Sequence, residues 1–138
     1  MLEQILIIIG AAIFGLLGVV HLLYTFFTPK FNAHNPDVTE AMKNTSPVLT
    51  KETTLWDAWI GFNASHSFGA IMVAAFFIPL AVFNFDVISQ SLWFSTLPVM
   101  IACSYLILAK KYWFKIPFYG IMLSSICFII ASIIIYSK

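Results

Sequence analysis

The sequence predicts an all-α integral membrane protein, folded as an antiparallel bundle of four transmembrane helices. Only 9% of its 138 residues are charged, whereas 61% are hydrophobic. A typical soluble domain is about 25% charged. The apolar residues fall into four long runs that are separated by short charged or polar segments. A chain of this composition cannot cover a water-soluble surface, so the lipid bilayer is its expected environment.

Each apolar run is long enough to cross a membrane as a helix. The runs cover residues 5–27, 55–85, 92–109 and 116–136. Even the shortest is about 27 Å long as a helix, against a hydrocarbon core of about 30 Å. Helices are expected because they satisfy every backbone hydrogen bond within one segment. Short connections between three of the runs predict antiparallel neighbours in a single domain over residues 1–138.

The one long connection, residues 28–54, is predicted to contain a short amphipathic helix. Asn35 suits the N-cap position and Pro36 the first helical position. Val38 and Met42 then form part of an apolar edge. This helix is expected to lie on the membrane or on the bundle.

The lysines predict the orientation in the membrane. Six of the seven basic residues lie in the loops 28–54 and 110–115. By the positive-inside rule these loops are cytoplasmic and both termini lie outside. The net charge of +1 and the absence of arginine argue against nucleic acid as a partner. The expected partners are the lipid bilayer and either another membrane protein or a second copy of the chain.

Polar side chains enter the second run well past its first turn. Steps of 100° per residue place two tryptophans, an amide, an imidazole and a hydroxyl on one face of this helix. His21 is grouped with glycines in the first run and is expected to point into the bundle, where it can share a cavity with that face. The predicted ligand-binding residues are His21, Trp56, Trp59, Asn63, His66 and Ser67.

Small residues at four-residue spacing predict close helix packing. Gly61, Ser65 and Gly69 follow one another at this spacing on the second run, and Gly10 and Gly18 lie on one face of the first. Such positions let a neighbouring backbone approach closely.

Each polar residue also has a purely structural interpretation. His21 and His66 can form interhelical hydrogen bonds, handle a ligand or a proton, or ligate haem. Asp57 follows Thr54 by three residues, which fits a capping box at the start of the second helix. Signatures of known catalytic or metal sites, such as paired intramembrane carboxylates or HExxH, are missing, so no catalytic residue and no metal ligand is predicted.

The sequence W-x-G-F-N-x-S-H-S-x-G occurs here from Trp59 to Gly69, within the longer segment 40–70, and HLLYTFFTPKF begins at His21. On these residues the first half of the chain resembles a family of small bacterial integral membrane proteins that has no assigned activity. The resemblance implies a four-helix fold and a location in the bacterial cytoplasmic membrane. In layout alone the chain is also similar to DoxX-like four-helix proteins, some of which are linked to quinone or thiol redox systems.

The leading functional hypothesis is a non-catalytic membrane protein. Its first two membrane helices would form a polar pocket for a small molecule, a proton or a partner segment. One alternative is a redox accessory protein that holds haem b or quinone. Another is a structural subunit of a larger membrane complex.

Overall fold

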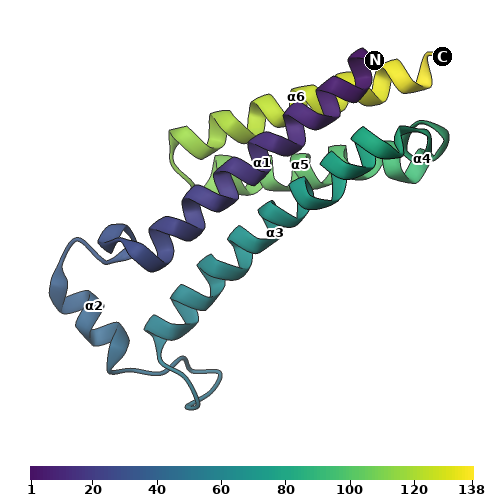
Figure 1. Cartoon of the computed structure of the whole chain (residues 1–138). Helices are drawn as coiled ribbons and strands as arrows, with labels where there is room; N and C mark the ends of the chain where they lie inside the picture. Colours follow the sequence, from purple (N-terminus) through teal and green to yellow (C-terminus); the bar gives the residue numbers. More distant parts are fainter. The chain divides into compact units, whose positions relative to one another are not determined.

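The structure is a computed structural model that describes residues 1–138, of which 83% are helical, with no strand. Four long helices are separated by shorter ones (Figure 1). In chain order the elements are α1 (Leu2–Phe27), η1 (Pro29–Phe31), α2 (Pro36–Lys43), α3 (Leu55–Phe83), α4 (Phe85–Gln90), α5 (Leu92–Tyr112) and α6 (Lys115–Tyr136).

The four predicted membrane helices correspond to α1, α3, α5 and α6. Each is long and apolar enough to cross a membrane, which confirms the all-α, four-helix membrane class. The helix ends differ from the apolar runs by a few residues. Helix α5 continues beyond 92–109 to Tyr112 and includes Lys110 and Lys111. Lysines are favourable in a last helical turn because they oppose the negative end of the helix dipole.

The shorter helices include one that the sequence predicts and one that it does not. Helix α2 begins at Pro36, and the Asn35 side chain accepts a hydrogen bond from the Asp37 amide. Its apolar residue Val38 is exposed. Helix α4 lies at the short connection between the second and third apolar runs, where no helix was predicted. It is only six residues long, and its Ile88 side chain is completely buried.

The chain divides into two compact units. One contains Met1–Leu17 and Ala70–Lys138, and the other contains Gly18–Gly69. The single domain expected from the sequence stays a prediction, and the two units are described separately below.

The core of the first unit is built around three phenylalanines from different helices. Phe14 of α1, Phe77 of α3 and Phe128 of α6 are each no more than 1% exposed. The Phe128 ring centroid lies 6.3 Å from that of Phe14 and 6.4 Å from that of Phe77. On the α5 side, the Tyr105 ring meets Phe14 edge-on at 5.2 Å. All four long helices therefore contribute to one aromatic core.

Small residues bring the helices of this unit together. A Cβ atom added at Gly10 would lie 2.8 Å from the Phe128 ring, and one at Gly15 would lie 2.7 Å from the Cβ of Ala74. These distances are shorter than van der Waals contact. Glycine is therefore required at both positions for α1 to approach α6 and α3 this closely.

Polar side chains tie the helices of the first unit together. Gln4 donates to the Ala81 carbonyl of α3, at 2.8 Å. Ser124 of α6 donates to the Gly10 carbonyl, also at 2.8 Å. Helices α1 and α6 lie side by side with both chain termini at the same end (Figure 1), where Lys138 pairs with the buried Glu3 carboxylate at 2.6 Å.

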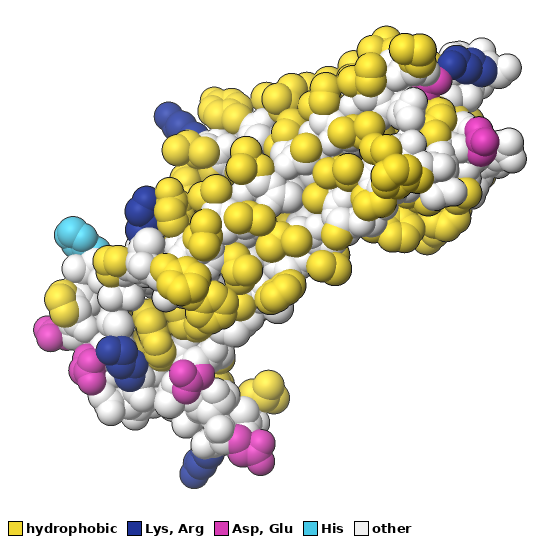
Figure 2. All heavy atoms as spheres, viewed as in Figure 1, with side chains coloured by type: hydrophobic (Ala, Val, Ile, Leu, Met, Phe, Trp, Pro, Cys, Tyr) yellow, Lys and Arg dark blue, Asp and Glu magenta, His cyan; other side chains and the backbone are white.

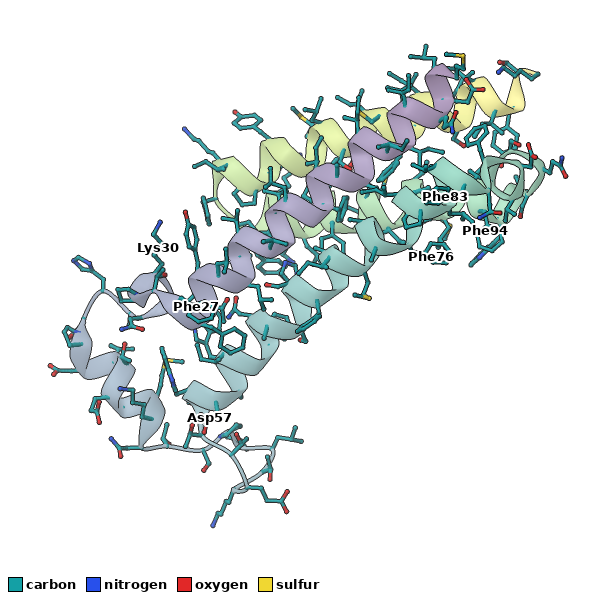
Figure 3. All side chains as sticks on the ribbon, viewed as in Figure 1. Phe27, Lys30, Asp57, Phe76, Phe83 and Phe94 are labelled. Carbon is teal, nitrogen blue, oxygen red and sulfur yellow. The ribbon has the colours of Figure 1, made fainter.

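The outer surface of the long helices is apolar. Figure 2 shows hydrophobic side chains over most of the visible face of the helices. Phe76 and Phe83 of α3 are exposed, and the ring centroid of Phe76 lies 6.2 Å from that of Phe94 of α5 (Figure 3). Such a surface matches lipid rather than water, as expected of a membrane protein.

Candidate functional site

The second unit brings together an imidazole and an amide from its two long helices. His21 of α1 and Asn63 of α3 are joined by a hydrogen bond of 3.0 Å between His21 Nε2 and Asn63 Oδ1. The Asn63 Nδ2 group donates to the Trp59 carbonyl one turn earlier, at 2.8 Å. This second bond fixes the amide with its oxygen toward His21. Because that oxygen can only accept, Nε2 of His21 is the protonated ring nitrogen.

His66 completes the polar cluster. Its ring centroid lies 5.5 Å from that of His21, with the two rings inclined at 66°. Both imidazoles are half-buried, and Asn63 is 6% exposed. Residue counting from the helix ends places His21 at a depth of about 10 Å and His66 at about 16 Å. The side chains span this offset, so the convergence expected from the helical projection is found.

An aromatic ring that the sequence analysis missed covers His21. Phe31 of η1 lies edge-on to the His21 ring, with centroids 4.7 Å apart. The Phe31 ring centroid also lies 6.2 Å from that of Trp59, whose Nε1 donates to the Phe31 carbonyl at 3.2 Å. The Thr28 side chain caps η1 and Pro29 begins it. The only signal in the sequence was this capped Thr-Pro turn, which gives no indication of a contact with His21.

Ser67 lies next to the cluster and bonds the backbone of its own helix. Its side chain is completely buried, and its hydroxyl donates to the Asn63 carbonyl at 2.9 Å. Thr25 makes the equivalent bond to the His21 carbonyl at 2.8 Å. Each of these hydroxyls donates its hydrogen to the helix backbone. They support the residues of the cluster, while a ligand contact by Ser67 stays a prediction.

The start of α3 is organised by a cap. Thr54 accepts from the Asp57 amide at 3.0 Å and donates to the Asp57 carboxylate at 2.8 Å. Asp57 therefore has a structural role at the helix start, although its carboxylate accepts from the Thr54 hydroxyl and not from the Thr54 backbone amide as in a full capping box. The Trp56 ring lies 5.8 Å from the Lys43 ammonium group, a cation–π contact between α3 and α2. A ligand contact by Trp56 stays a prediction.

The small residues predicted to pack helices fall into two groups. Gly10 is in close contact with Phe128, and Gly18 is buried. Gly61, Ser65 and Gly69 are instead exposed, and a Cβ at Gly61 would meet no atom within 4 Å. Close packing is thus not found at Gly61 within this chain, because its side of α3 faces outward. Packing of this ridge against a second chain stays a prediction.

The cluster contains no ready-made metal centre. No group of three or more His, Cys, Asp or Glu side chains lies close enough together to hold a metal ion. The His21 Nε2 atom already donates to Asn63, so an iron bound there would replace this hydrogen bond. The arrangement places two imidazole rings and an amide where they can contact a hydrogen-bonding group.

Comparison with known proteins gives no match to this chain among protein-family models, curated proteins or solved structures.

Proposed function

We propose that this membrane protein binds a proton, or a small polar ligand that exchanges one, at the His21–Asn63–His66 cluster within α1 and α3. The observation that carries the proposal is the hydrogen bond from His21 to Asn63, with the second imidazole 5.5 Å away. Polar side chains at membrane depth are costly unless they are paired, and they commonly mark ligand or proton sites.

The hydrogen bond to Asn63 does not prevent protonation of His21. Asn63 Oδ1 accepts from Nε2, and Nε2 carries a hydrogen in both the neutral and the protonated ring. The second proton would add to Nδ1, so the contact between α1 and α3 survives the change of charge. Asn63 therefore orients the imidazole and leaves its other nitrogen to exchange the proton.

The distance between the imidazoles favours a single positive charge on the pair. Two unit charges 5.5 Å apart repel by about 3 kcal/mol at an effective dielectric constant of about 20. A proton on one ring therefore opposes a proton on the other. The pair would act as one proton-binding unit rather than as two independent histidines.

The proposed location is a bacterial cytoplasmic membrane, with the loops 28–54 and 110–115 in the cytoplasm. The lysine distribution and the resemblance to small bacterial four-helix membrane proteins support this placement. His21 lies six residues before the end of α1, about 10 Å from the cytoplasmic end of that helix. A proton would then reach the cluster from the cytoplasmic side.

A difference titration tests the proposal. Purified wild-type protein and the double variant His21→Gln/His66→Gln are titrated from about pH 8 to about pH 5, the range in which histidines change charge. Glutamine keeps hydrogen-bonding groups but does not titrate there. We expect the wild-type protein to take up one proton more than the double variant. A difference of two would show independent histidines, and a difference of zero would show a purely structural cluster.

The exposed histidine provides a matched control. His34 lies in the loop between η1 and α2 and is exposed. Introduced into both the wild-type protein and the double variant, His34→Gln should leave the difference in bound protons between them unchanged. His66→Gln alone should leave the number of protons taken up unchanged, because His21 can then accept the single proton without opposition.

A further inference from the structure

A basic hollow lies at the turn between α5 and α6, within the first unit. Its volume is about 240 Å³, and its lining includes Lys110, Trp113, Lys115, Phe118 and Tyr119. A water molecule occupies about 30 Å³ of liquid. The hollow therefore has room for a phosphate group together with several waters.

The turn carries positive charge that nothing nearby in the chain balances. Lys110 and Lys111 lie in the last turn of α5, and Lys115 is the first residue of α6. The segment 109–119 contains no Asp or Glu. By contrast, the three lysines of the loop 28–54 share it with three acidic residues.

The start of α6 adds a second, independent attraction for an anion. This helix has 22 residues, and its N-cap residue Phe114 provides no side-chain hydrogen bond. Pro117 has no amide hydrogen, so Lys115 and Ile116 carry the first amides of the helix. Uncapped amides and the positive end of the helix dipole favour a bound anion.

We propose that this hollow binds the phosphodiester headgroup of an anionic membrane phospholipid. Lys110 and Lys115 would contact the phosphate oxygens as charged donors. The aromatic rings of Trp113 and Tyr119 stand at the end of two membrane-spanning helices, where tryptophan and tyrosine meet lipid headgroups. A basic pocket between transmembrane helices is a suitable site for such a headgroup. The inference is independent of the proton site proposed above.

Native mass spectrometry in a nonionic detergent tests the proposal. Phosphatidylglycerol and phosphatidylcholine are titrated separately, and the dissociation constant of the first bound lipid is measured. We expect wild-type protein to prefer phosphatidylglycerol. Each of Lys110→Gln and Lys115→Gln should weaken phosphatidylglycerol binding by about fivefold, and the double variant by about 25-fold.

Lys111→Gln is the matched control, because Lys111 lies in the same turn but does not line the hollow. It should weaken binding less than twofold. A loss equal to that of the other two variants would show diffuse surface attraction and would overturn the proposed site. Equal binding of the two lipids to wild-type protein would overturn it as well. Inorganic phosphate is added as a competitor in a third titration. If phosphate displaces phosphatidylglycerol when the two are at similar concentrations, the site binds free phosphate and not lipid.

Discussion

The same substitution at two glycines should have opposite effects on stability. In Gly10→Ala the new methyl group would lie 2.8 to 3.0 Å from three atoms of the Phe128 ring. That ring is 1% exposed and lies between Phe14 and Phe77, so it has little room to move. Overpacking of this kind costs about 1–3 kcal/mol, against a gain in helix propensity of about 1 kcal/mol. We expect a net loss of up to about 2 kcal/mol in the free energy of unfolding.

Gly61→Ala is the control for the helix-propensity effect alone. A Cβ at this position meets no atom within 4 Å, so only the propensity gain of roughly 0.5–1 kcal/mol remains. Unfolding is measured by circular dichroism as mixed micelles are enriched in dodecyl sulfate. A Gly10→Ala protein that is stabilised as much as Gly61→Ala would refute the packing argument. A destabilised Gly61→Ala protein would show that the exposed side of α3 contacts another chain or a part of this one.

Three further predictions concern topology and two contacts between helices. A cysteine introduced at Lys43 should be shielded from an impermeant thiol reagent in intact cells, whereas one at Asp86 should react; the reverse pattern would refute the orientation. Tyr136→Phe removes the hydroxyl that is bonded to α5 at 2.7 Å and should lower the free energy of unfolding by about 1 kcal/mol, with unchanged stability as the contradicting result. Lys138→Gln leaves the Glu3 carboxylate, which is 7% exposed, without one of its partners. The melting temperature should therefore fall. The difference from the wild-type melting temperature should shrink in high salt, because salt screens an ion pair whose lysine is exposed.

The sequence predicted the four long helices because the length of an apolar run and its flanking charges determine a membrane span. It did not predict α4, since six residues are too few to show a helical period. It also gave no sign of the Glu3–Lys138 ion pair. These residues stand at opposite ends of the chain, and only the packing of α1 against α6 brings them together.

The candidate site was predicted only in part, because the sequence shows which residues share a helix face but not how two helices pack. Asn63 and His66 are three residues apart on one helix, so the period alone places them on one face. The position of His21 relative to these two residues depends on how α1 and α3 pack. The sequence showed only that His21 lies on the glycine-rich face of α1. Phe31 was missed because it belongs to a three-residue helix in the loop, where no periodicity exists. The bond from Ser67 to its own helix backbone was not predicted, because position on a helical face does not show which acceptor a serine hydroxyl will use.

The ¹⁵N spectra of the imidazole rings test the coupled proton site most directly. They are recorded in micelles over the pH range of histidine titration, with the exposed His34 as an internal reference. The account predicts that neutral His21 carries its hydrogen on Nε2, that His21 and His66 change together in a single one-proton step, and that Asn63→Leu alters both rings but not His34. Independent titration of His21 and His66, or spectra unchanged by Asn63→Leu, would contradict it.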